Sequence, residues 1–307
     1  MLTTDGAEQA RLRAPAQALL GPAAVATMRP QIARSVEASI DSVVGNEGPV
    51  DKVLADHTAA AALAAVLTTE LSAKFLQMVR ASRLVLNPLP QPALRLQTVA
   101  ASTMVDRWTT SHVATLADVS EPQCPAERFA TDPRLSSQEK AATMGLCIIG
   151  GFSPLTDLVT SGLMLARDPE LRSKMLEAPT AFLEELVRWQ SPVPFAARQA
   201  LQDIDLPSGT VRGGQRCLVH LGAANHDPEQ FENPSLFDPS REQGRPLGFG
   251  HGAHYCMGAA LTRIALPTIW TAMLDRWHEF VLEGDSSWTS EPFPRRMRPA
   301  ALRWAAR

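Results

Sequence analysis

Long apolar runs, clustered cysteines and charged tails are all absent from this sequence. Its longest purely apolar run, Ala59–Leu67, is far shorter than the roughly 18 residues that suggest a membrane span. No basic segment followed by an apolar stretch opens the chain. The four cysteines are too few and too scattered for a disulfide framework, which fits a reducing compartment. With a net charge of −3, nucleic acid is not an expected partner. These absences predict a cytoplasmic protein that binds neither membrane nor nucleic acid.

The residues that are present indicate an ordinary globular chain. At 307 residues, with 45% hydrophobic and 20% charged residues, it is long enough to bury most of its apolar surface. Neither a repeat nor a low-complexity linker divides it, so we expect a single domain over residues 1–307.

Apolar residues at helical spacing predict helices over 7–26, 29–44, 51–69, 71–84, 93–116 and 137–170, and from about 257 to 278. Loops are expected at 86–92 and, exposed, at 121–134. Short strands are expected at 199–205, 210–211 and 215–219, with a closing hairpin over 280–304.

One loop near the C-terminus carries the clearest chemistry. Its pattern is F-x-x-G-x-H-x-C-x-G, made by Phe249, Gly252, His254, Cys256 and Gly258. A cysteine at the start of a helix has free backbone N–H donors and the positive end of the helix dipole beside it, so we expect its thiolate to be favoured. The nearby glycines allow the backbone to pass close to a large flat ligand. The loop therefore predicts a metal-binding thiolate.

This loop resembles the signature loop of the cytochrome P450 haem-thiolate proteins. The resemblance implies haem b as the cofactor and Cys256 as the proximal iron ligand. It also implies His254 as a partner of a haem propionate, with Phe249, Gly250 and Gly258 forming the haem-facing loop. A thiolate ligand donates electron density to the iron and favours O–O cleavage.

Two other interpretations of the loop remain open from the residues alone. A single cysteine in a glycine-rich turn is often only a small buried hydrophobe. His251, His254 and Cys256 could instead bind zinc, although a structural zinc site needs four ligands and the other cysteines lie far away in the sequence.

The N-terminal segment resembles the family's helix that crosses the haem face. At the position where the family commonly has a propionate-binding histidine this chain has Gln9, whereas the arginine four residues later is kept as Arg13. Arg198 stands where the family places another propionate-binding arginine, on a strand at the haem edge. In typical members a small β-sheet and the loop that roofs the pocket precede this helix. The resemblance implies that both are missing here and that the pocket is open, or covered by a second subunit.

A helical segment contains Glu185 and Arg188 at E-x-x-R spacing, on one face of the helix. Such pairs abound on solvated helices, but this one precedes a long segment that resembles the family. The resemblance implies that the pair is structural and buried beneath the proximal side, braced by Phe237 and Arg241.

The helix expected at 137–170 resembles the family helix that passes over the open side of the iron. One alignment puts Gly150 and Gly151 beside the haem, with Ser153 at the usual acid and Pro154 at the usual threonine; shifted by one residue, Phe152 and Ser153 take those positions. Either way the acid that helps to deliver protons is absent, and proline cannot relay protons. Pro154 inside a helix costs about 3 kcal/mol and predicts a kink. The alternative is a helix boundary after the glycine pair.

These observations predict a mainly α-helical, cytochrome P450-like fold with small β elements. The first hypothesis is a haem-thiolate oxidoreductase of natural product biosynthesis that lacks the usual acid–alcohol relay and performs an oxidative tailoring step, or a haem-assisted cyclisation or rearrangement. Its expected partners are a small-molecule substrate, possible carrier-protein delivery and a ferredoxin-type reductant. The second hypothesis is a non-enzymatic, P450-like auxiliary protein that activates a glycosyltransferase. The intact Cys256 loop argues against the second.

Overall fold

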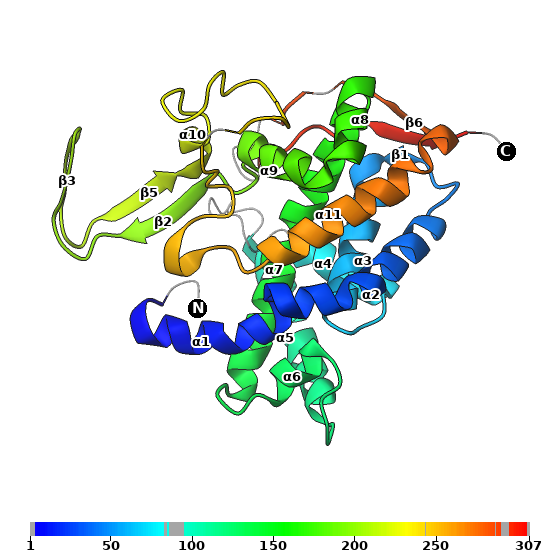
Figure 1. Cartoon of the computed structure of the whole chain (residues 1–307). Helices are drawn as coiled ribbons and strands as arrows, with labels where there is room; N and C mark the ends of the chain where they lie inside the picture. Colours follow the sequence, from blue (N-terminus) through cyan, green and yellow to red (C-terminus); the bar gives the residue numbers. More distant parts are fainter. Residues whose placement is uncertain are drawn as a thin grey trace.

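The computed structural model describes residues 4–82, 85, 95–242, 244–285, 287–289 and 295–305. The loop predicted at 86–92 lies outside the described residues. The fold is mainly helical, as predicted, and helix α7 (Ser137–Leu165) runs through its middle (Figure 1). The helices before it are α1 (Gly6–Leu20), α2 (Pro22–Asp41), α3 (Asp56–Val66), α4 (Ala73–Ser82), α5 (Arg95–Ala117) and α6 (Pro125–Thr131). Those after it are α8 (Pro169–Glu177), α9 (Pro179–Gln190), the short α10 (Leu221–Ala224) and α11 (Ala259–Leu274).

The first two helices meet at a different residue from the one predicted. The break lies at Gly21, whose extended backbone ends α1, and Pro22 begins α2. Proline suits this first helical position because its missing N–H would have no partner there. Pro30, which the sequence placed in the first turn of a helix, instead lies inside α2.

The predicted exposed connection at 121–134 is wrong, because it contains helix α6. Pro125 is in the first turn of α6, and the side chain of Glu127 accepts hydrogen bonds from the backbone N–H groups of Gln123 and Cys124. Phe129 and Ala130 are buried, where α6 packs against α1 and α5. The turn residues of this segment therefore mark the two ends of a short helix.

Helix α7 is continuous through its glycine pair and through Pro154, which excludes the alternative of a helix boundary after the glycine pair. Ser136 caps its start by accepting a hydrogen bond from the N–H of Glu139, whose carboxylate returns a bond to Ser136. By length and composition α7 could cross a membrane, but 67% of its most apolar window is buried inside the fold. Core helices of globular proteins pass the same test, so this is weak evidence for a membrane span.

The strands are short and form three antiparallel units. Strand β2 (Phe195–Gln199) pairs with β5 (Arg216–His220), and β3 (Ile204–Leu206) pairs with β4 (Gly209–Val211) in a hairpin that extends away from the helices (Figure 1). The predicted strand at 199–205 is wrong, since β2 ends at Gln199 and β3 begins only at Ile204. The closing hairpin was predicted correctly as β6 (Phe280–Glu283) and β7 (Ala301–Trp304), to which β1 (Gly48–Pro49) adds a third strand. Helix α11 contains Pro267 and ends at Leu274, earlier than predicted.

Candidate functional site

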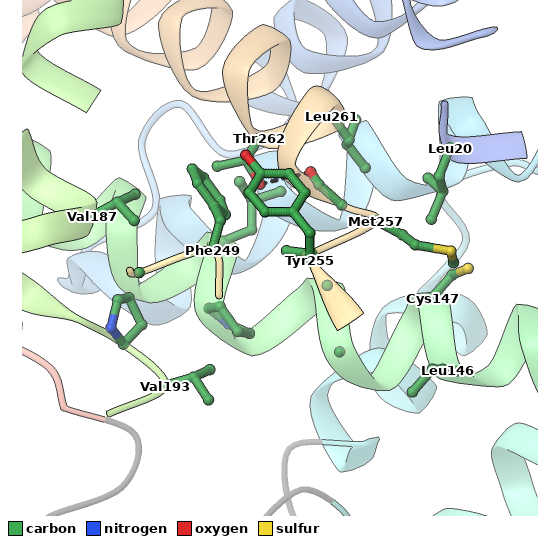
Figure 2. A pocket seen from close by; sticks show the side chains of 18 of the residues that line it. Leu20, Leu146, Cys147, Val187, Val193, Phe249, Tyr255, Met257, Leu261 and Thr262 are labelled. Carbon is green, nitrogen blue, oxygen red and sulfur yellow. Dashed lines mark hydrogen bonds between the residues drawn. The ribbon is translucent and has the colours of Figure 1, made fainter. Parts of the chain in front are cut away.

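A cavity of about 230 Å³ lies where α7, α11, α1 and the cysteine loop meet (Figure 2). Apolar side chains form most of its wall. It is lined by Arg13, Leu20, Leu63, Leu146, Cys147, Gly150, Gly151, Pro154, Leu155, Leu158, Val187, Pro192, Val193, Gly248, Phe249, His254, Tyr255, Cys256, Met257, Gly258, Leu261 and Thr262. Elements that are far apart in the sequence thus enclose one space, in which Cys256 is a wall residue.

The cysteine loop is shaped by two left-handed glycines. Gly250 and Gly252 have φ angles of +72° and +71°, a backbone conformation that other residues adopt only with strain. The N–H of Cys256 donates to the carbonyl of Phe249 at 2.8 Å, which folds the loop back on itself before α11 begins. This geometry holds Cys256 in place through the backbone alone.

The thiol of Cys256 is exposed to the cavity. The backbone N–H groups of Gly258 and Ala259 point at its sulfur, as expected for a helix start, and Arg13 and Arg263 add positive potential. Burial nevertheless dominates and raises the pKa of Cys256, so in the absence of a cation the thiolate is not favoured. The sequence-based expectation of a favoured thiolate is therefore wrong for the protein without a bound cation. The expected N–H donors are present and lower the pKa of the thiol, but the burial of the sulfur raises it by more.

Helix α1 is attached to the cysteine loop by side chains that bind the backbone of the loop. Gln9, at 4% exposure, donates from Nε2 to the carbonyl of Ala253 at 2.8 Å, and Arg13 donates to the carbonyl of Tyr255. Figure 1 shows α1 beneath this loop. Gln9 therefore has a structural role at the position where the sequence indicated only a missing histidine.

His254 lines the cavity but its Nε2 donates to the Asp5 carboxylate at 2.8 Å. Asp5 directly precedes α1 and had no visible signal in the sequence.

Arg198 lies on β2, is exposed, binds only the carbonyl of Ala197 among the contacts of the described residues, and does not line the cavity. The predicted propionate partners Arg13 and His254 are thus brought together at the cavity, and Arg198 is not.

Arg263 is a residue of the site that the sequence analysis missed. Its guanidinium lies 4.8 Å from the ring centre of Phe249 and donates to Glu184 at 2.6 Å and to the hydroxyl of Tyr255 at 3.1 Å. It therefore fixes the ring of Phe249 against the start of α11. It lies in the second turn of α11 (Ala259–Leu274), and the sequence analysis gave no signal for it.

The residues of α7 that the two sequence alignments singled out differ in whether they line the cavity. Gly150, Gly151 and Pro154 line the cavity, Ser153 does not, and Phe152 is fully buried in the core. The one ionisable group on this face is Cys147, and burial raises its pKa to about 12. Within the described residues, this face of α7 offers the cavity no carboxylate and no hydroxyl.

The predicted Glu185–Arg188 pair is buried, and Arg188 is fully inaccessible. Arg188 forms two bonds of 2.7 Å to the carboxylate of Glu185, and Arg241 approaches the same carboxylate at 3.4 Å. The ring of Phe237 packs 4.9 Å from that of Phe182. The pair thus lies at the centre of a hydrogen-bonded network, with Phe237 in the apolar layer beside it.

Asn225, which is fully buried, connects this network to the cysteine loop. Its carbonyl accepts from Arg188 at 2.7 Å, and its side-chain oxygen accepts from the N–H of Leu247 at 2.7 Å. Arg188 therefore supports the loop that begins at Leu247 through one intermediate residue. Sequence alone gave no signal for Asn225, because the contact joins three distant segments.

The donors present fit haem better than zinc. Within the described part of the chain, no group of three or more histidine, cysteine or acidic residues is arranged to hold a metal, so the zinc interpretation lacks its ligands. By contrast, a single thiol with two backbone donors faces an apolar cavity edged by Arg13 and His254, two side chains with N–H donors. A flat apolar ring with carboxylate groups at its edge matches that donor set.

Comparison with known proteins shows a similarity to cytochrome P450 proteins over part of the chain. The sequence model described as "Cytochrome P450" matches residues 172–301. The chain is 35% identical over 163 residues to the biotin biosynthesis cytochrome P450 of Bacillus subtilis, and 36% identical over 151 residues to the mycinamicin IV hydroxylase/epoxidase of Micromonospora griseorubida. This part of the chain is similar to cytochrome P450 proteins. The cytochrome P450 family binds haem through a cysteine thiolate.

The matched segments cover 52% and 46% of this chain, but only 41% and 37% of those two P450 relatives. Solved structures agree with the fold over nearly the whole chain. P450BioI in complex with an acyl carrier protein that carries hexadec-9Z-enoic acid matches with a TM-score of 0.85 at 24% identity, covering 98% of this chain and 81% of that one. The LnmA P450 hydroxylase of the leinamycin pathway of Streptomyces atroolivaceus matches with a TM-score of 0.82 at 22% identity, covering 98% and 81%.

Proposed function

We propose that this protein is a haem-thiolate oxidoreductase of biosynthetic metabolism in which Cys256 ligates the iron. The observation that carries the proposal is the exposure of the Cys256 thiol to an apolar cavity whose edge holds Arg13 and His254. The names of the relatives, which act in biotin, mycinamicin and leinamycin metabolism, support a biosynthetic role.

The residues of this chain would bind and enclose the cofactor. The N–H groups of Gly258 and Ala259 would hold the negative charge on the sulfur of Cys256, and Arg13 and His254 would offset the propionate charges. The apolar wall formed by α7 and α11 would exclude water. Haem held by a thiolate supplies oxidative chemistry, in which electron donation by the sulfur favours O–O cleavage.

The test is the absorption spectrum of the reduced, carbon monoxide-treated protein after expression with haem supplied. We expect a strongly red-shifted Soret band for the wild type and its loss in Cys256→Ser. Cys147→Ser is the matched control, because it removes the other thiol of the same cavity and should keep the band. A wild type that stays colourless would contradict the proposal.

We further propose that ordinary hydroxylation driven by a ferredoxin and NAD(P)H is weak, because the cavity face of α7 lacks an acid and a hydroxyl. The neutral thiol of Cys147 is a poor substitute, since a pKa of about 12 keeps its proton in place. The chemistry would then be peroxide-driven oxidation, or a cyclisation or rearrangement without net oxidation.

Introducing a hydroxyl into that face tests the missing relay. Pro154→Thr should raise the product formed per NAD(P)H consumed by at least about tenfold, because positioned proton transfer contributes about 10²–10⁴-fold to rates. Ser153→Ala is the control: Ser153 does not line the cavity, so its loss should leave turnover unchanged. Efficient hydroxylation by the wild type would refute the relay hypothesis without affecting the haem assignment.

For the substrate, we propose an apolar small molecule or acyl chain, delivered on a carrier protein in the cytoplasm. The apolar lining supports the first part, and the carrier-bound fatty acid on P450BioI supports the second for that protein. A ferredoxin-type protein would supply electrons. A shift of the Soret band on adding an acyl carrier protein loaded with a fatty acid, and not on adding the unloaded carrier, would support carrier delivery.

An auxiliary role without haem is the second candidate. The absence of proton donors on the cavity face of α7 favours it, whereas the preserved cysteine loop opposes it. Co-purification with a glycosyltransferase, together with a protein that binds no haem, would favour the auxiliary role.

A further inference from the structure

A hydrogen bond joins the N-terminal segment to the cysteine loop at the edge of the cavity. The carboxylate of Asp5 accepts a hydrogen bond from Nε2 of His254 at 2.8 Å, across 249 positions of sequence. The two side chains differ in environment: Asp5 is 83% exposed, and His254 is 20% exposed and lines the cavity. The more solvated partner is therefore the carboxylate.

Asp5 is also the residue that should cap helix α1. Its backbone is extended, with φ −126° and ψ 176°, as is typical of the residue before the first helical turn. Aspartate in this position usually accepts a bond from the N–H groups of the first turn, but here the side chain makes no capping bond. The Asp5 carboxylate thus has two alternative partners, His254 and the start of α1, and uses the first.

We infer that Asp5 is an internal competitor for a haem propionate: it occupies the N–H of His254 until haem arrives, and is then displaced to cap α1. This inference rests on the proposed function. An aspartate and a propionate present the same carboxylate group, and a single N–H directs a strong bond to only one acceptor. The cost of displacement is reduced because the first turn of α1 offers free N–H donors and its positive dipole end to the released carboxylate.

The other contacts between α1 and the loop do not need to change. Gln9 and Arg13 bind the backbone carbonyls of Ala253 and Tyr255, which flank His254, so the loop stays attached to α1 when Asp5 moves. Arg13 and His254 both line the cavity with N–H donors, and an entering carboxylate would meet both. The exchange therefore involves one bond in an otherwise fixed interface.

Haem titration of the haem-free protein, followed at the Soret band, tests the competition. Asp5→Asn keeps a capping side chain and removes the charge, and Asp5→Ser keeps the cap and is too short to reach His254. Both should bind haem about two- to fivefold more tightly, because an ion pair with one exposed partner is weak. Glu8→Gln is the control: it removes the same charge from the same turn, where Glu8 binds Arg11, and should leave haem affinity unchanged.

Thermal unfolding of the haem-free protein gives a readout independent of haem. If Asp5 and His254 interact, Asp5→Ser should lower the unfolding temperature in the wild-type background and have a smaller effect beside His254→Gln. Equal or weaker haem binding by both Asp5 variants, with a normal Soret band, would overturn the competition alone. No Soret band in any protein, wild type included, would overturn the proposed function and this inference together.

Discussion

Arg188 is the clearest case of a single residue on which the surrounding structure depends. It is fully buried, it neutralises Glu185, and it donates to the carbonyls of Asn225, Pro234 and Leu236. Replacing Glu185 by Gln leaves this charge uncompensated, so we expect the free energy of unfolding to fall by about 3–5 kcal/mol. Urea unfolding followed by circular dichroism measures this. Glu170→Gln, which breaks the exposed pair with Lys174, should cost less than about 1 kcal/mol.

Two of the glycines in helix α7 differ in the space that is available for a side chain. A Cβ at Gly162 would lie 2.5 Å from Nε1 of the buried Trp270, whereas a Cβ at Gly150 would meet nothing within 4 Å. Gly162→Ala should therefore destabilise the haem-free protein by about 1–3 kcal/mol through overpacking. Gly150→Ala should stabilise it by up to about 1 kcal/mol, because alanine is the better helix former. Equal effects of the two substitutions in urea unfolding would show that α7 does not pack on α11 in this way.

The protein as a whole should lose stability in mild acid through its half-buried histidines. Burial lowers the pKa of His226 below the ordinary histidine value of 6.5, as it does for His57, and Arg295 and Arg188 lower that of His226 further. The unfolded chain then binds more protons than the folded one, so their contribution to stability is complete above about pH 6.5 and is lost as the pH falls below it. Between pH 7.5 and 5.5 the urea midpoint should fall, and His57→Gln combined with His226→Gln should flatten this slope. An unchanged slope in the double variant would contradict the assignment.

What the sequence by itself determined about this protein is what depends on spacing along the chain: the cysteine loop ahead of α11, Glu185 and Arg188 on one face of α9, most of the helices, and the closing hairpin. These follow from local periodicity and from backbone requirements that neighbouring residues meet. Only the tertiary structure decided which side of α7 faces the cavity, that α6 is helical, that Arg198 points elsewhere, and that Asp5, Gln9 and Asn225 bind the cysteine loop. Such contacts join segments up to 249 residues apart. Their energy depends on how distant segments pack together in the folded chain, and the local sequence around each residue does not determine this packing.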